Sequence, residues 1–426
     1  MHCSPIRDGA LLVTRQPFKH KPSLGASDIR KYIGPGFLVA VGFIDPGNWA
    51  ANIAAGSLYG YNLLWVITLS TLMLILVQHN AAHLGIATGL CLAEASTRFM
   101  RKGTSRTVLF SAVLASIATT LAEILGAAIG LQMLFGLPLF IGSLCSALFA
   151  VFMLLSNSYR SLERWIIGFV SLIGLAYLFE LSLVNVQWSE VLKRAVTPSF
   201  PSGSIPIIMS VLGAVVMPHN IFLHSEIIQS RQWNLESHET IKKQLRFEFL
   251  DTLSAMGVGW AINSAMIVVA ATVFRANGIT VTDLTQAQAT LKPLLGSAAA
   301  TIFALALIFS GLSSSITAAV AGGSIFAGIF LEPYDPADKH TRLGICITMV
   351  GALLAIAFIT DPFQGIIWSQ IILSIQLPLT ILSLLFLTSS TRVMGKFANK
   401  RGANILLWCS ALVIIFLNGI LLWQSF

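Results

Sequence analysis

The feature that most constrains the fold of this chain is a succession of apolar runs, each about 20 residues long. A helix of that length just crosses the hydrocarbon core of a bilayer. Hydrophobic residues make up 55% of the 426 residues and charged residues only 10%, far more apolar surface than a water-soluble core of this size needs. We therefore predict an all-α membrane protein with eleven transmembrane helices. The predicted spans are 33–60, 61–87, 107–136, 138–157, 165–186, 205–229, 250–274, 296–329, 343–360, 364–388 and 404–424.

The basic residues predict the orientation of these spans. The chain has 26 Lys and Arg residues and a net charge of +8. If the N-terminus is cytosolic, all but four of them lie in cytosolic segments, as the positive-inside rule requires. The four exceptions are Lys193, Arg194, Arg275 and Lys292. Because the basic residues gather on one side of the predicted membrane, we expect them to set the orientation of the chain in a lipid bilayer. We expect no nucleic acid as partner. The expected location is the plasma membrane, as a multi-pass protein of a bacterial inner membrane, with the N-terminus cytoplasmic and the C-terminus outside.

Two proline motifs interrupt predicted spans near mid-membrane. The first span contains Asp-Pro-Gly-Asn at 45–48, about 12 residues and hence roughly 18 Å from its start, and the sixth contains Met-Pro-His-Asn at 217–220. Proline has no N–H, so each one frees the carbonyl four residues earlier, at Gly42 and Ala214. Unpaired carbonyls inside a membrane are tolerated only where they line a cavity or meet a ligand. A bound cation would satisfy both.

The two motifs share the pattern x-Pro-x-Asn and occupy corresponding places in the two halves of the chain. We expect a first repeat of five helices at 33–186 and a second at 187–388, which the odd number of spans inverts. Paired broken helices in inverted repeats point to the substrate site of a secondary transporter. A cytosolic basic tail at 1–32 and a connecting loop with an eleventh helix at 389–426 complete the predicted organisation.

The donors at the two breaks favour a divalent transition metal. They comprise the Asp45 carboxylate, the Asn48 amide oxygen and the Met217 thioether, together with the carbonyls of Gly42 and Ala214. A methionine alone is ordinarily a gap-filling core residue. Beside a proline break and a mid-membrane carboxylate, its sulfur favours soft metals, whereas Ca²⁺ and Mg²⁺ prefer oxygen throughout. Mn²⁺, Fe²⁺ and Cd²⁺ are the expected substrates, and no cofactor is expected.

These residues resemble the paired signatures of the Nramp divalent metal transporters. The resemblance extends from the two proline motifs along most of the chain. The further matching segments are Leu-Gly-Ile-Ala-Thr-Gly (84–89), Leu-Ala-Glu-Ile-Leu-Gly-Ala-Ala (121–128), Gly-Leu-Ser-Ser-Ser-Ile-Thr-Ala (311–318) and Ser-Gln-Ile-Ile-Leu-Ser-Ile-Gln-Leu-Pro (369–378).

The resemblance implies a LeuT-type fold and import of divalent metal by alternating access, driven by proton and voltage gradients. In such a protein the metal is held at the two breaks, and two further groups join in the occluded state. The implied ligands are Asp45, Asn48, Met217 and the Ala214 carbonyl, joined by the Gly42 carbonyl and Gln370.

The resemblance also implies a proton route through the third and ninth spans, with Glu123 and Arg342 on it. His219 beside the metal and His224 toward the inward vestibule match family positions, although both can also be hydrogen-bonded helix histidines. One departure concerns this route, because Thr120 stands where the family usually has an aspartate and a threonine cannot take a proton. We therefore expect protons to move either together with the metal, as symport, or separately, as uniport. The sequence leaves open how tightly the two movements are coupled.

Other functions fit the residues less well. A Na⁺-coupled amino-acid symporter of the same fold would not need Met217, and a magnesium-transporting relative would be expected to replace it. The sequence has no G-x-S-x-G, H-E-x-x-H or phosphate-binding glycine loop, so neither an enzyme nor an ATP-driven pump is expected. We expect a monomer.

Overall fold

The computed structural model describes residues 44–156, 175, 179, 181–230, 237–295 and 297–425. Within these ranges the regular structure is entirely helical, without strands. The basic tail at 1–32, residues 33–43 of the predicted first span and residues 165–174, 176–178 and 180 of the predicted fifth span lie outside them.

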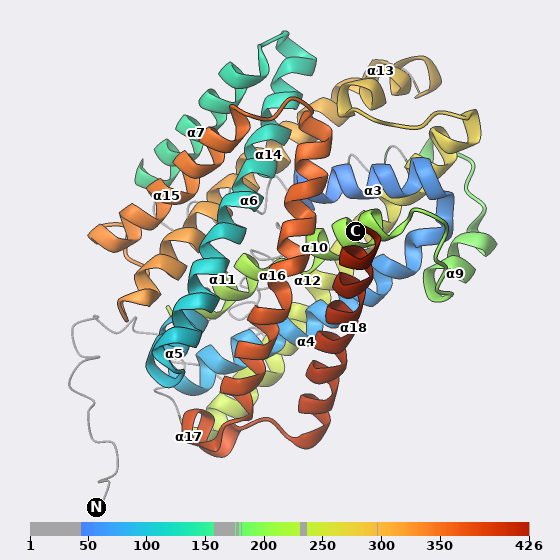
Figure 1. Ribbon diagram of the computed structural model, residues 1–426. Coiled ribbons are helices and arrows are strands. Elements are labelled where there is room, and N and C mark those ends of the chain that lie inside the picture. Colours follow the sequence, from blue (N-terminus) through green and yellow to red (C-terminus); the bar gives the residue numbers. More distant parts are fainter. Residues whose placement is uncertain are drawn as a thin grey trace, which may run out of the picture.

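The helices follow one another through short connections (Figure 1). The α-helices are α3 (Pro46–Tyr59), α4 (Leu64–Thr88), α5 (Leu92–Phe99), α6 (Lys102–Phe135), α7 (Leu139–Ser156), α9 (Trp188–Val196), α10 (Ile205–Val215), α11 (Pro218–Gln229), α12 (His238–Val273), α13 (Leu284–Leu295), α14 (Ser297–Ile329), α15 (Lys339–Ile356), α16 (Pro362–Ser389), α17 (Thr391–Met394) and α18 (Arg401–Ser425). Three short 3₁₀ helices are η3 (Gly60–Leu63), η5 (Arg275–Asn277) and η6 (Gly395–Phe397).

Eight helical stretches of the described chain are long and apolar enough to cross a membrane. One of them joins α3 to α4 through η3, and another joins the two halves α10 and α11. The apolar helix α7 is shorter. An all-α protein with many potential spans is thus confirmed.

The longest helices form a bundle around the broken ones. α14 packs along α6, α12 packs along both α3 and α4, and α16 contacts α10 and α6. The ribbon places α10 and α11 near the middle of the bundle, while α18 lies at its edge against α16 (Figure 1). The start of α3 and the break between α10 and α11 are therefore enclosed by helices from both halves of the chain.

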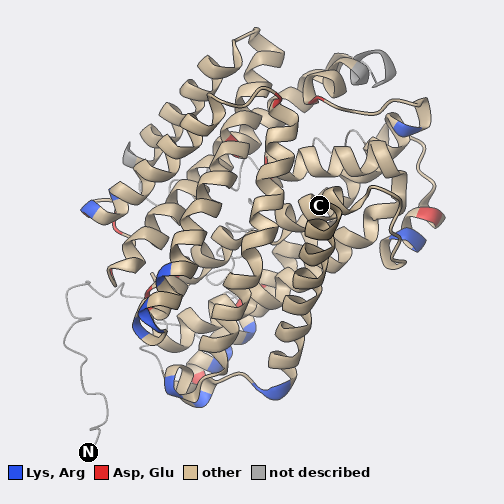
Figure 2. Ribbon diagram, in the orientation of Figure 1, with Lys and Arg blue, Asp and Glu red and all other residues tan. Residues whose placement is uncertain are grey.

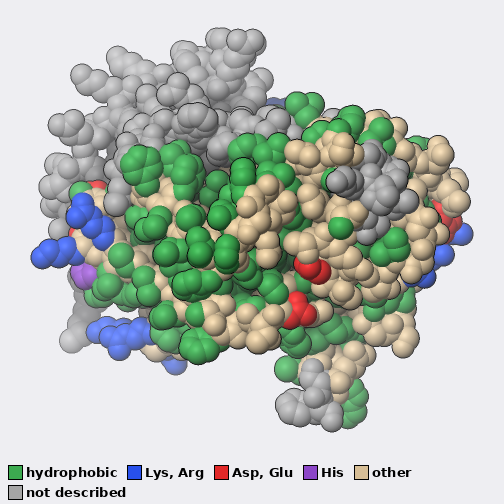
Figure 3. Space-filling view, turned by 90° about the horizontal axis from the view of Figure 1, so that it is seen from above, with side chains coloured by type: hydrophobic (Ala, Val, Ile, Leu, Met, Phe, Trp, Pro, Cys, Tyr) green, Lys and Arg blue, Asp and Glu red, His purple; other side chains and the backbone are tan. Residues whose placement is uncertain are grey.

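Charged and apolar side chains are segregated. Lys and Arg gather near α5, α17 and α9, at the ends of the bundle, and its middle is almost without them (Figure 2). The face seen in Figure 3 carries a broad area of hydrophobic side chains with basic residues at its margin. Such an apolar band with charged ends suits a lipid environment.

One helix boundary differs clearly from the sequence prediction. α12 begins at His238 rather than near residue 250, because Ser237 caps its N-terminus by accepting a hydrogen bond from the Thr240 N–H at 3.3 Å. The added turns are amphipathic: Lys242 and Lys243 lie between the buried residues Ile241 and Gln244. A search for uniformly apolar runs cannot detect such turns.

Candidate metal centre

Asp45 is the N-cap of α3, inside the predicted first span. Its backbone is extended, and Pro46 at the first helical position is compatible with a helix start because that position needs no N–H. Asp45 Oδ1 accepts hydrogen bonds from the Asn48 backbone N–H at 2.6 Å and from Asn48 Nδ2 at 3.0 Å. Asp45 is fully buried, so this N-cap holds a carboxylate inside the protein at the start of α3.

The chain before α3 is held by bonds from other groups. Because the Asn48 N–H donates to Asp45, it is not available to the Ile44 carbonyl. That carbonyl instead accepts a hydrogen bond from Trp49 Nε1 at 3.2 Å and one from the Ser310 hydroxyl of α14. The broken segment is therefore fixed by α14 as well as by its own helix.

The sixth span breaks where its proline predicts. α10 ends at Val215, Val216 and Met217 leave helical geometry, and α11 starts at Pro218. The Ala214 carbonyl, which Pro218 deprives of its helical donor, accepts a hydrogen bond from Asn48 Nδ2 at 2.9 Å. One amide thus joins the two breaks, although 166 residues separate them in the chain.

Met217 lies three residues beyond this bond and is 1% exposed. Its sulfur accepts a hydrogen bond from Asn220 Nδ2 at 3.8 Å. Its side chain packs in a small apolar cluster with Ala115 and Ala118 of α6 and Leu373 of α16. These contacts hold the thioether at the break rather than in the main core.

Gln370 reaches this region because glycines let α16 approach both broken helices. A Cβ at Gly47 would overlap the Gln370 side chain, and a Cβ at Gly213 would overlap the Gln370 backbone carbonyl. Gln370 is fully buried; its Nε2 donates to Ser369 Oγ at 3.0 Å, while its Oε1 accepts no hydrogen bond from the described residues. A buried amide oxygen of this kind is available to a cation.

Glu123 of α6 lies close to Asp45. The two carboxyl side chains interact, and Thr119 Oγ1 donates to Glu123 Oε1 at 3.3 Å. Two buried carboxyl groups repel one another when both are charged, so a proton or a cation must compensate them. Thr120, one position after Thr119, is fully buried, and its hydroxyl has no hydrogen-bond partner within the described residues.

The other predicted residues lie at various distances from this centre. His219 is 2% exposed on the first turn of α11, and His224 is fully buried further along it. Arg342 is exposed on the first turn of α15, where its Nε donates to the Pro336 carbonyl at 2.7 Å, so the structure does not bring it to Glu123. Gly42 lies outside the described residues.

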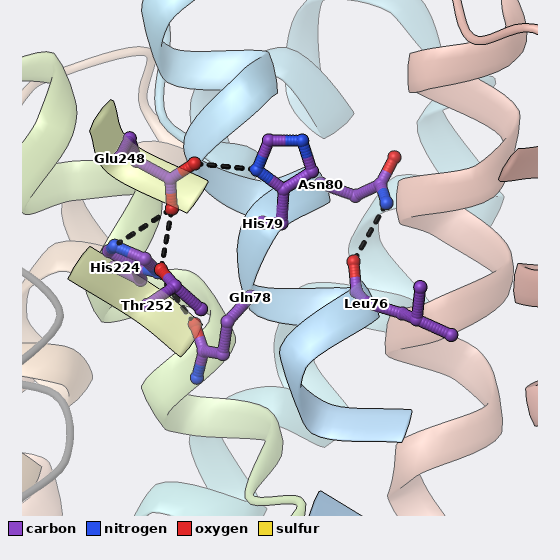
Figure 4. A network of polar contacts seen from close by, with 7 residues as sticks. All are labelled: Leu76, Gln78, His79, Asn80, His224, Glu248 and Thr252. Carbon is purple, nitrogen blue, oxygen red and sulfur yellow. Dashed lines mark hydrogen bonds and ion pairs between the residues drawn. The ribbon is translucent and has the colours of Figure 1, made fainter. Parts of the chain in front are cut away.

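Sequence reasoning missed a second polar cluster, which surrounds His224 (Figure 4). Its other members are Gln78 and His79 of α4 with Glu248 and Thr252 of α12. Glu248 lies just outside the predicted span 250–274, so the hydropathy pattern does not mark it as an intramembrane carboxylate. In the structure α12 begins at His238, which places Glu248 inside this helix in a buried position.

The far end of α11 is tied to the loop between α14 and α15. Glu226 accepts hydrogen bonds from Ser324 Oγ at 3.1 Å and from the Tyr334 N–H at 3.4 Å. Burial raises the pKa of the Tyr334 phenol well above its usual range, and the nearby Glu226 raises it further. The phenol therefore stays neutral and packs as a core residue.

Known proteins resemble this chain over most of its length. Residues 36–424 match the Nramp family, described as natural resistance-associated macrophage protein-like. The chain is 39% identical over 398 residues to the divalent metal cation transporter MntH of Caldanaerobacter subterraneus subsp. tengcongensis, covering 93% of each chain. It is 37% identical over 405 residues to the divalent metal cation transporter MntH of Bacillus subtilis, covering 94% of each.

Solved structures agree with these matches. The manganese transporter of Eremococcus coleocola, in complex with an aromatic bis-isothiourea substituted compound, aligns with a TM-score of 0.81 at 27% identity, covering 96% of this chain and 90% of that one. Mhp1, a nucleobase-cation-symport-1 family transporter, aligns with a TM-score of 0.62 at 15% identity, covering 90% of this chain and 91% of that one. The second likeness concerns the fold alone.

Proposed function

Because this chain belongs to the Nramp family of membrane transporters, we propose that it imports divalent transition metal ions of the Mn²⁺, Fe²⁺ and Cd²⁺ class by alternating access. It is a transporter and not an enzyme. The proposed architecture is the LeuT-type arrangement of eleven spans in two inverted five-helix repeats plus a last helix. We place it as a monomer in a bacterial inner membrane, with the N-terminus in the cytoplasm and the C-terminus outside.

One observation carries the metal proposal, namely the hydrogen bond from Asn48 Nδ2 to the Ala214 carbonyl. It joins the break that holds a buried carboxylate to the break that holds a buried thioether. The proposed ligands are Asp45, Asn48, the Ala214 carbonyl and Met217, with the Gly42 carbonyl and Gln370 joining as the site closes. One negative charge, several oxygens and one sulfur favour a soft divalent ion over Ca²⁺ or Mg²⁺.

Removal of the Met217 thioether tests this selectivity. In Met217→Ala proteoliposomes, competition by Ca²⁺ or Mg²⁺ against Mn²⁺ uptake is expected to increase by about tenfold, equivalent to about 1.4 kcal/mol of lost discrimination. The matched control is Met209→Ala, which removes another buried methionine, from α10, and should leave the competition unchanged. Equal effects of the two substitutions would contradict a ligand role for Met217, and a wild type that moves no Mn²⁺ would refute the proposed function.

For the proton we propose a route from the metal site through Glu123, with His219 and His224 as further titratable groups. Arg342 could act only where this route ends, near the start of α15. Thr120 interrupts the route because it offers a hydroxyl in a buried position where a carboxyl group would carry a proton. We therefore expect loose coupling of protons to metal uptake.

Thr120→Asp tests the proposed interruption. With internal pH recorded during Mn²⁺ uptake, the substitution is expected to raise the number of protons moved per metal ion, because the new carboxyl group lies one helical turn from Glu123. Thr120→Val, which is similar in shape and equally unable to ionise, should keep the wild-type ratio. If wild type already moves protons in strict proportion to Mn²⁺, loose coupling is wrong.

A further inference from the structure

The polar cluster around Glu248 has an unusual composition for a membrane interior. Glu248 is 2% exposed and lies between two histidines from two other helices, His79 of α4 and His224 of α11 (Figure 4). His79 Nδ1 is 2.6 Å from Glu248 Oε2, and His224 Nε2 is 4.0 Å from Glu248 Oε1. One carboxylate with an imidazole beside each oxygen is a donor set typical of transition-metal sites.

Neighbouring groups orient these donors. His224 Nδ1 donates to Gln78 Oε1 at 2.9 Å, which leaves Nε2 of the neutral imidazole as the nitrogen that faces Glu248. Thr252 Oγ1 donates to Glu248 Oε1 at 2.6 Å and so fixes the carboxylate plane. Outer partners that set the tautomer of a histidine and the orientation of a carboxylate are what metal-binding residues in proteins usually have.

Binding of an ion requires these donors to move slightly closer together. Bonds from Zn²⁺ to nitrogen and oxygen are about 2.0–2.2 Å, so two ligands of one tetrahedral ion lie roughly 3.4 Å apart. His224 Nε2 and Glu248 Oε1 are 4.0 Å apart, somewhat farther than that. On the other side, His79 and Glu248 share a proton that a metal ion would displace, as happens when histidine becomes a ligand. The His79 side chain is 27% exposed, whereas that of Glu248 is 1% exposed.

A further buried amide lies next to this cluster. Gln244 precedes Glu248 by one turn on the same face of α12 and is 1% exposed. Neither of its side-chain polar atoms has a hydrogen-bond partner within the described residues. An unsatisfied buried amide costs free energy, and a cation or its water would satisfy the Gln244 oxygen.

The cluster lies along α11 from the metal centre. Met217 and His224 are seven residues apart, which is roughly 10 Å at 1.5 Å per residue. His79 also lies in the half of α4 that ends at Thr88, near the basic end of the bundle at α5. On the predicted topology this is the cytosolic side.

From this geometry we infer a second divalent transition-metal site, formed by Glu248, His79 and His224, which takes up the ion on its way from the centre at Asp45 to the cytosol. The donor set stands by itself, whereas the place on an exit route rests on the proposed transport function. Between the two sites the ion exchanges a thioether for imidazole nitrogen, so it stays coordinated by donors that suit Mn²⁺, Fe²⁺ and Zn²⁺.

Imidazole coordination distinguishes the second site from the first. The proposed ligands at the first site contain no imidazole, so electron spin-echo measurements on purified protein with excess Mn²⁺ should detect imidazole nitrogen coupled to the metal when the second site is occupied. The coupling is expected to be lost in Glu248→Gln and to weaken in His79→Gln and in His224→Gln. It should persist in His219→Gln, which removes the imidazole beside the first site.

His340 allows a test of a competing site. It is 2.7 Å from Glu332, and the ligand atoms of Glu332, Asp338 and His340 all lie within 4.8 Å of one another around the start of α15, so this half-buried group could also hold a metal ion. His340→Gln should leave the coupling unchanged. Loss of the coupling in that variant, or its survival in Glu248→Gln, would assign the bound metal elsewhere and overturn the inference.

The wild-type measurement keeps the inference open to refutation even if a variant fails to fold. Wild type that shows no imidazole coupling refutes the second site, because the buried histidine and carboxylate then form only an ion pair. Uptake of Mn²⁺ by the same preparation in liposomes reports separately on the proposed function. Uptake without coupling removes the second site alone, and coupling without uptake removes the transport proposal and leaves the binding site.

Discussion

Asp45→Asn is expected to lower Mn²⁺ uptake by about 10²- to 10³-fold, because removing one partner of a buried charge pair costs about 3–5 kcal/mol, and each 1.4 kcal/mol is tenfold. The substitution removes the carboxylate from the first break and leaves an amide oxygen that can still accept the capping bond from the Asn48 N–H. Metal affinity and uptake should therefore fall together while the protein remains folded. Uptake of ⁵⁴Mn²⁺ into proteoliposomes measures the effect.

Asp45→Ala and Glu190→Gln serve as comparisons. Asp45→Ala removes the cap as well as the charge, so it should lose uptake and also lower the thermal stability in detergent. Glu190→Gln neutralises the partly exposed carboxylate of α9, which is 2.7 Å from Arg194, and should change neither property. If Asp45→Asn retained more than about a tenth of the wild-type uptake, a loss below 1.4 kcal/mol, Asp45 would not be the principal ligand.

Gly213→Val is expected to destabilise the protein by about 3 kcal/mol, because a side chain there overlaps the Gln370 backbone. This value is the upper end of the roughly 1–3 kcal/mol that overpacking a tight core usually costs. A backbone carbonyl cannot rotate away as a flexible side chain can. α16 must therefore move away from α10, which also withdraws Gln370 from the metal centre. Thermal unfolding in detergent measures the first effect, and Mn²⁺ titration measures the second.

Gly257→Val is the matched control for this experiment. It makes the same substitution inside α12, where an added Cβ meets no atom within 4 Å, so the change in helix propensity is the same and the steric overlap is absent. The difference between the two variants isolates the contact with α16. Equal melting temperatures would contradict the close approach of α10 and α16.

The metal donors could be predicted from the sequence to a large extent because the chemistry that marks them is local. Proline removes a defined donor from a defined carbonyl, so Pro218 alone predicts the break between α10 and α11 and the freed Ala214 carbonyl. A carboxylate in an apolar run stands out in the same way. What could not be predicted is that Asn48 bonds this carbonyl, because that bond joins residues far apart in the chain.

The proton residues were less predictable. The resemblance placed Glu123 and Arg342 on one route, and only Glu123 lies beside Asp45 in the structure. An arginine shows a similar local pattern at a helix end whether it faces a polar path or the solvent. Its orientation depends on which helix packs against it.

The sequence by itself determined the class of this protein and the location of its breaks, because hydropathy and proline chemistry act within one helix. The tertiary structure alone decided which buried polar residues meet. α4, α11 and α12 bring His79, His224 and Glu248 together across three separate helices. The apolar pattern of each helix predicts its burial, but the face it presents to its neighbours depends on packing among all of them.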